Sequence, residues 1–281
     1  MPKLKVNGAS LNYEIAGPKD SALVVLSNSL STDLRMWAPQ AASLAQRHRV
    51  LRYDTRGHGQ SKATPAPYHI DTLADDLAGL LDALADRPAH IVGLSLGGMT
   101  AQVLAIRRPE LVASLCLVAT TCRPPFGTRA AWAARAEEVR AAGGYDAMLN
   151  PMLDRWLTRR FRRARPDAVA AITDMILSTP LEGYVGCCHA IGSLDACGRL
   201  ADFPRPICVI AGEEDPGTTV EDAEMIGAGL AHAELHVVPH ARHLLNWDGE
   251  PAFTAMLTQW LAKVAALNLG SPVMRDIGTV G

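Results

Sequence analysis

The amino-acid sequence predicts an α/β fold, a mostly parallel sheet of eight strands with helices on both faces. Two observations favour it: short apolar runs typical of buried strands recur along the chain, and helical patterns separate most of the later ones. The clearest helix, over 71–84, carries a leucine stripe on one face. The clearest expected strands span 11–16, 23–27, 50–53, 89–92, 114–118, 207–211 and 235–238.

The pattern divides the 281 residues into one core interrupted by a helical cap. The core is expected over 1–123 and again over 202–269. Between them, 124–201 contains no convincing strand, only helix-like segments rich in Ala, Arg and Leu. The last residues, 270–281, are expected to form a frayed tail. This length is normal for one α/β domain that carries an insertion.

Charge and hydropathy exclude several classes of partner. The net charge of −2 gives no basic surplus, so no nucleic-acid partner is expected. The N-terminus lacks the apolar run of a signal peptide, and no segment has the ~20 apolar residues of a membrane span. We therefore expect a cytoplasmic protein with a small-molecule substrate. The sequence does not predict an oligomeric state.

The six cysteines show neither Cys-x-x-Cys nor zinc-like spacing. Without an export signal, reduced thiols are the expectation. Cys116 and Cys208 lie in apolar runs and are expected in the core, whereas the adjacent Cys187 and Cys188 receive no role. No set of histidines and carboxylates has the spacing of a metal site, so neither a metal nor another cofactor is expected.

One glycine-flanked serine joins an expected strand to an expected helix. Residues 89–98 read Ala-His-Ile-Val-Gly-Leu-Ser-Leu-Gly-Gly, the layout of a nucleophile elbow with Ser95 at its tip. Gly93 and Gly97 remove β-carbons that would clash in so tight a turn. The pattern predicts a serine nucleophile; the alternative is a structural turn with a bystander serine.

An active serine needs a base and an acid to orient it, here in the chain order serine, acid, histidine. The loop after the sixth of the expected strands offers Glu213, Glu214 and Asp215, and the loop after the seventh offers His240 and His243. We choose Asp215, which lies furthest along its loop and precedes a proline. We choose His243, because a helix follows it and its loop is suited to return towards the site.

Two backbone N–H groups should stabilise the oxyanion that forms when the serine attacks a carbonyl. One is expected from Leu96, directly after the nucleophile. The other is expected from the loop after an early strand, and we assign it to Leu30.

With this site in place, the chain resembles the α/β-hydrolase family over nearly its whole length, and within it the 3-oxoadipate enol-lactonases. The stretch 27–37 is the most diagnostic, because Asn28-Ser29 stands where most relatives have His-Gly; Ser31 departs from the usual glycine. The other segments that carry the resemblance are Leu51 to Gly59, Gly93 to Met99, and Glu182-Gly183-Tyr184.

The resemblance implies a serine hydrolase of aromatic catabolism, in the β-ketoadipate pathway, that opens an enol-lactone through an acyl-enzyme. Because such a lactone carries a carboxylate, a cation should line the pocket. The candidates are Arg35, Arg123 and the arginines near Arg159, and Trp156 and Tyr184 are candidates for an apolar roof.

Two other readings fit the same residues. A general carboxylesterase or a C–C bond hydrolase would use the same serine, acid and histidine under a different cap. A non-catalytic homologue would bind a small ligand without turning it over.

Overall fold

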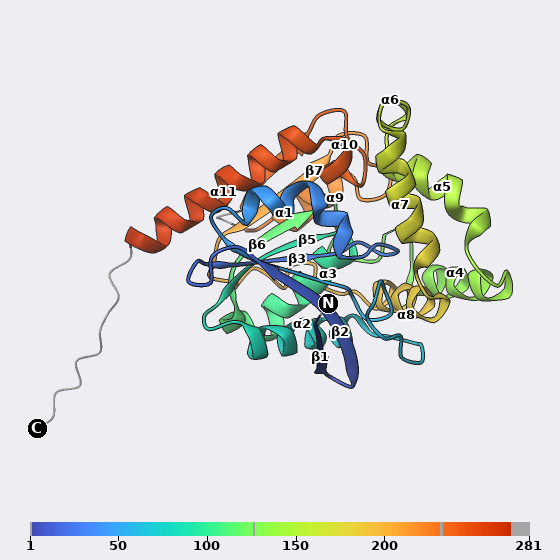
Figure 1. The fold of residues 1–281 in the computed structure, drawn as a ribbon, viewed down its shortest axis with the longest axis horizontal. Helices are drawn as coiled ribbons and strands as arrows, with labels where there is room; N and C mark the ends of the chain where they lie inside the picture. Colours follow the sequence, from blue (N-terminus) through green and yellow to red (C-terminus); the bar gives the residue numbers. More distant parts are fainter. Residues whose placement is uncertain (1, 126, 231–232, 271–281) are drawn as a thin grey trace, which may run out of the picture.

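The structure is a computed structural model that describes residues 2–125, 127–230 and 233–270. Its centre is a sheet of eight strands in the order β1-β2-β4-β3-β5-β6-β7-β8 (Figure 1). The strands are β1 (Lys3–Val6), β2 (Ala9–Ala16), β3 (Leu23–Ser27), β4 (Arg49–Tyr53), β5 (Ala89–Leu94), β6 (Val112–Val118), β7 (Ile207–Gly212) and β8 (Ala233–Val238).

The α/β fold is confirmed, and the sheet is parallel from β4 to β8. Strands β3, β5, β6 and β7 are buried at every position, which explains their continuous apolar runs. Among the strands that the structure describes, the antiparallel pairs are β1 with β2 and β2 with β4. Among the strands, β1 was absent from those the apolar runs predicted, because Lys3 and Lys5 alternate with Leu4 and Val6 on a half-exposed edge.

Helices cover both faces of the sheet (Figure 1). Helices α2 (Ile70–Leu84) and α3 (Leu96–Arg107) pack together on one face, while α1 (Ala38–Leu44) packs with α10 (Leu245–Asp248) and α11 (Glu250–Gly270). The remaining core elements are α9 (Val220–Gly227) and the short helices η1 (Leu34–Trp37) and η2 (Pro109–Leu111). In the described residues, no helix is both long and apolar enough to cross a membrane.

Between β6 and β7 the described residues form five helices, which we call the cap. They are α4 (Arg129–Ala141), α5 (Asp146–Trp156), α6 (Arg159–Ala164), α7 (Pro166–Ser178) and α8 (Leu181–Gly192). The cap lies to one side of the sheet (Figure 1). Helix α8 rests on the loop after β4 so closely that a Cβ at Gly183 would overlap the carbonyl of Gly57. The expected tail, 270–281, lies outside the described residues beyond Gly270.

The expectation of six reduced cysteines is wrong for one pair. Cys122 and Cys197 form a disulfide, with their Cα atoms 4.8 Å apart. They are 75 residues apart in the sequence and meet only because the cap leaves and rejoins the core at the same place, so local spacing could not predict the pair. Cys116 and Cys208 are free and buried, as expected.

Candidate active site

Ser95 lies in the sharp turn between β5 and α3. Its backbone has φ 55° and ψ −114°, a conformation that is unfavourable for a residue with a side chain. The Ser95 carbonyl accepts hydrogen bonds from the Thr120 hydroxyl at 2.8 Å and from the Met99 N–H at 2.9 Å. A Cβ at Gly97 would overlap the Ser27 carbonyl, so the glycine lets the loop after β3 approach the turn. The elbow is therefore held by its surroundings.

Asp215 and His243 meet beside this turn. The Nδ1 atom of His243 lies 2.8 Å from Oδ2 of Asp215, which also accepts a bond from the Thr218 hydroxyl at 2.7 Å. The other carboxylate oxygen accepts the N–H groups of Gly217 and Thr218. Burial alone would raise the pKa of Asp215, but the charge and hydrogen bond of His243, with these donors, hold that pKa below its usual value. The ionised Asp215 thus orients the ring, and Nε2 is left to accept a proton.

The residues that competed for these roles lie apart from the cavity. His240 is exposed, and its ring nitrogen faces Glu213 at 3.4 Å and Glu214 at 3.7 Å. The His240 N–H also donates to Glu213. Ser95 lines the same cavity as the acid and the histidine selected above, and we call these three the candidate triad.

The two expected oxyanion donors lie on neighbouring elements. Leu96 is the first residue of α3, and Leu30 lies in the loop after β3 and lines the cavity. A buried histidine fixes this loop: the Ser31 N–H donates to Nε2 of His58 at 3.0 Å. Because Nε2 accepts, the neutral ring carries its proton on Nδ1, which faces the Arg56 carbonyl at 3.2 Å. Ser31 itself has φ 59°, a backbone conformation that favours glycine.

An open cavity joins the candidate triad to the cap, and its empty space, with the solvent at its mouth included, is about 530 Å³. Its floor comes from the core and its roof from the cap. The residues around it are Ser29, Leu30, Ser95, Met99, Pro125, Trp132, Arg135, Met152, Arg155, Trp156, Ile191, Asp215, Gly217, Thr218 and His243. Trp156 reaches the triad, with its ring centroid 6.3 Å from that of His243.

Two arginines of the cap, Arg135 and Arg155, line this largely apolar cavity. The Arg135 Nε donates to the Tyr184 hydroxyl at 2.8 Å, and its guanidinium lies 5.6 Å from the Trp132 ring centroid. Burial, followed by repulsion from Arg135, lowers the pKa of Arg155. Cap helices thus bring two positive groups to the roof of the cavity.

The cations proposed from the sequence do not reach this cavity. Arg35 binds Asp33 at 2.7 Å and Asp174 at 2.8 Å on another surface. Arg123 and Arg159 are exposed, and neither lines the cavity. Of the two expected roof residues, Trp156 lines the cavity, whereas Tyr184 is fully buried behind it and contacts Arg135.

Sequence reasoning missed both arginines, although a signal existed. Trp132 and Arg135 are three residues apart on α4, so they share a helix face. Met152 and Arg155 have the same spacing on α5. An arginine that shares a face with large apolar residues in an insertion is a candidate for the cavity, whereas the dense run around Arg159 is a solvated surface.

The chain belongs to the α/β-hydrolase family, whose model matches residues 22–250. This family match and the relatives described below show that the protein is a hydrolase.

Among its relatives is 3-oxoadipate enol-lactonase 2 of Acinetobacter baylyi, 36% identical over 250 residues, or 89% of this chain and 92% of that protein. The solved enol-lactonase of Burkholderia xenovorans is 37% identical, with a TM-score of 0.88 over 93% of this chain and 100% of the other. A thermophilic esterase of Thermogutta terrifontis, solved with malate bound, has the same TM-score at 27% identity and covers 94% of this chain and 99% of the other.

Proposed function

We propose that this hydrolase opens a small enol-lactone that carries a carboxylate, with 3-oxoadipate enol-lactone as the substrate and 3-oxoadipate as the product. The observation that carries the proposal is a single cavity with the candidate triad in its floor and two arginines in its apolar roof. Relatives named as 3-oxoadipate enol-lactonases, at 33–36% identity, support it.

The triad geometry fits attack on an acyl carbon. His243 Nε2 takes the proton of Ser95 as the hydroxyl attacks the ring carbonyl. Asp215, held ionised, stabilises the imidazolium that results. The Leu30 and Leu96 N–H groups receive the oxyanion, and in such sites one donor contributes about 10²–10³ in turnover.

An enol-lactone suits this site because its leaving group is an enolate, which departs more readily than an alkoxide. The enolate takes the proton from His243 and tautomerises to a ketone, which disfavours ring closure. Water, deprotonated by His243, then attacks the acyl-Ser95 carbonyl and releases the second carboxylic acid.

The roof supplies the selectivity for a charged substrate. A carboxylate beside Arg135 and Arg155 gains charge-assisted hydrogen bonds in a cavity whose lining is largely apolar. It also relieves the repulsion between the two guanidinium groups, which contributes to the lowered pKa of Arg155. A neutral ester gains neither benefit. We therefore assign these two arginines, in place of Arg35, to the substrate carboxylate.

The test compares the enol-lactone with a neutral p-nitrophenyl ester. We expect Arg135→Met and Arg155→Met to raise KM for the enol-lactone about 10- to 100-fold, as for the loss of a charge-assisted bond, and to leave neutral-ester hydrolysis within about twofold. Arg129→Met, at an exposed arginine that begins α4, is the matched control.

Equal losses on both substrates would contradict the assignment of the arginines. Hydrolysis of simple esters without preference for the enol-lactone would instead favour a general carboxylesterase; the similar protein from Thermogutta terrifontis is named an esterase. No turnover by wild type, with binding retained, would favour the non-catalytic homologue.

A further inference from the structure

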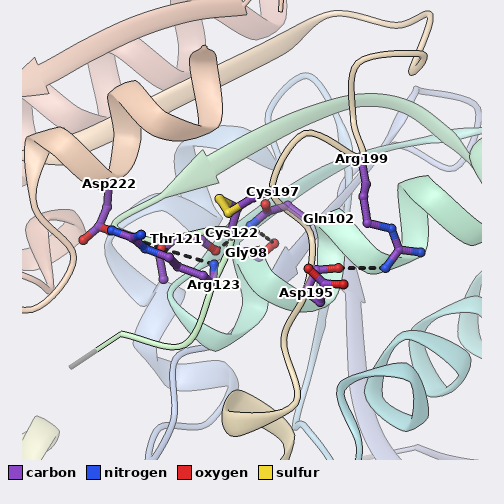
Figure 2. Close-up of a disulfide and its surroundings, with 9 residues drawn as sticks. All are labelled: Gly98, Gln102, Thr121, Cys122, Arg123, Asp195, Cys197, Arg199 and Asp222. Carbon is purple, nitrogen blue, oxygen red and sulfur yellow. Dashed lines mark hydrogen bonds between the residues drawn. A yellow bond between two sulfur atoms is a disulfide. The ribbon is translucent and has the colours of Figure 1, made fainter. Parts of the chain in front are cut away.

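The Cys122–Cys197 disulfide joins the two ends of the cap. Cys122 follows β6 just before the chain enters the cap, and Cys197 follows α8 just before the chain returns to β7. Figure 2 shows the bond between these two passing segments, and the Ala196 N–H donates to the Cys122 carbonyl at 2.9 Å beside it. All five cap helices therefore lie inside the loop that the disulfide closes.

We call the two segments that carry Cys122 and Cys197 the neck of the cap, and the segment of Cys122 is tied to the nucleophile helix α3. Gln102 of α3 donates from Nε2 to the Thr121 carbonyl at 2.9 Å, as Figure 2 shows. Thr120 donates to the Ser95 carbonyl. The segment that carries Cys122 thus has a fixed position relative to the core.

On the other side the neck supports the cavity roof. Pro125 lines the cavity three residues after Cys122, and its carbonyl accepts the Trp132 Nε1–H at 2.7 Å. Trp132 lies against Arg135. Ile191, near the end of α8, also lines the cavity before the chain reaches Cys197. The disulfide therefore fixes the spacing of two roof segments.

The two cysteine residues of the disulfide differ in exposure. Cys122 is 2% exposed, whereas Cys197 belongs to an exposed turn. The four free cysteines, Cys116, Cys187, Cys188 and Cys208, are all buried. An external thiol therefore has one accessible cysteine to attack, at the surface end of the neck.

We propose that Cys197 is a thiol–disulfide exchange site, and that a dithiol reductant acting there loosens the cap neck and weakens substrate binding. A reductant thiolate attacks the Cys197 sulfur, the Sγ–Sγ bond breaks, and its electron pair leaves with Cys122, which takes a proton from solvent. The second thiolate of the reductant then attacks the reductant sulfur that is bound to Cys197. The mixed disulfide breaks, and Cys197 leaves as a thiolate that takes a proton from solvent. The protein gains two electrons and two protons, and the dithiol becomes a disulfide.

Reduction should act on KM more than on kcat. The candidate triad is held by hydrogen bonds within the core, such as those from Gly217 and Thr218 to Asp215, and these do not depend on the neck. The cap also keeps other attachments, including the Leu244 N–H to the Trp156 carbonyl and the Ile70 N–H to Ser193. The reduced protein therefore stays folded with a looser roof.

The test is native-state reduction with dithiothreitol, followed by iodoacetamide and intact-mass analysis, with kinetics on a p-nitrophenyl ester. We expect two newly alkylated thiols, at Cys197 before Cys122. We expect KM to rise about 3- to 10-fold with kcat within about twofold, the size of effect for roof groups that lose their alignment. Reoxidation with oxidised dithiothreitol should restore KM.

The double variant C122S/C197S is the matched control. It should show the raised KM without reductant and no response when reductant is added. Release of thiols only after denaturation would overturn the exchange site, and an unchanged KM in the reduced wild type would overturn its link to binding. Because a neutral ester is the substrate, the result does not depend on whether the enol-lactone proposal holds.

Discussion

The core and the cap build opposite sides of one cavity by different means. The core places Ser95, Asp215 and His243 at the ends of parallel strands, where backbone hydrogen bonds hold each turn. The cap places Arg135 and Arg155 from helices, through side-chain contacts such as the bond to Tyr184. The difference implies that the core carries out the reaction and the cap binds the substrate. Changes in the core should therefore lower kcat, and changes in the cap should alter KM and substrate preference.

The largest expected effect tests the core. Ser95→Ala removes the attacking oxygen, and we expect kcat to fall about 10⁵- to 10⁶-fold with little change in the thermal midpoint. The measurement is steady-state hydrolysis of the enol-lactone and of a neutral ester, beside a melting curve. A variant that keeps a tenth of wild-type activity on either substrate would show that Ser95 is a bystander, and the division between core and cap would fail.

The second prediction tests backbone positioning in the core without removing any reacting group. Gly97→Ala places a Cβ against the Ser27 carbonyl and pushes the loop that carries Leu30 away from α3. Since this separates the two expected oxyanion donors, we expect kcat to fall about 10²- to 10³-fold on all substrates.

Gly227→Ala is the matched control for this change, because Gly227 is also a helical glycine but a Cβ there meets nothing within 4 Å. It should leave kcat unchanged. A Gly97→Ala enzyme that loses affinity but keeps its turnover would place the oxyanion donors elsewhere.

The core was the more predictable region, and its chemistry explains why. Ser95 stands in a turn that demands glycines at fixed offsets. Asp215 follows β7, which is buried throughout, and His243 follows β8, a half-exposed strand whose apolar residues are still visible in the sequence. These signals are local. Once the strands are assigned, the fold brings their ends together, and Ser95, Asp215 and His243 line one cavity.

The cap resisted prediction because its determinants are not local. Arg135 and Arg155 reach the cavity only through the packing of α4 and α5 over the core. In the sequence Arg35 is a candidate for binding the substrate carboxylate, but the fold pairs its guanidinium with Asp174 of the distant α7. The disulfide depends on where the cap rejoins the core. Gly183 and Tyr184 show the same limit. The sequence singles out their motif, but it does not predict that Gly183 packs on Gly57 or that the Tyr184 hydroxyl binds Arg135.

The third prediction concerns the pH dependence of core stability. Burial lowers the pKa of both His58 and His90 to about 4, against an unfolded value of about 6.5. The unfolded chain therefore binds more protons between these values, so stability is full above about pH 6.5 and falls as the pH drops towards 4. At pH 5 we expect each histidine to cost about 2 kcal/mol of unfolding free energy.

Urea unfolding at pH 7.5 and pH 5 measures this loss. His58→Gln removes one titration and keeps an acceptor for the Ser31 N–H, so the variant should lose about half of the pH dependence and keep the loop in place. His90→Gln should remove a similar share without any effect on kcat, since His90 faces Ser114 inside the sheet. Wild-type stability that is flat between these pH values would contradict both assignments.

The smallest expected effect tests the cap through a residue that lies behind the cavity. Tyr184→Phe deletes the hydroxyl that accepts a hydrogen bond from Arg135 Nε. It keeps the ring, whose centroid lies 5.2 Å from that of Tyr145. Losing one such hydrogen bond corresponds to about 1 kcal/mol, so KM for an anionic substrate should rise about fivefold while kcat and neutral-ester hydrolysis stay unchanged. In an Arg135→Met background the same substitution should do nothing further, because the group it positions is gone. If the effects of the two substitutions on KM add, Tyr184 acts on the cavity by a route other than Arg135. A fall in kcat would contradict the assignment of catalysis to the core and substrate binding to the cap.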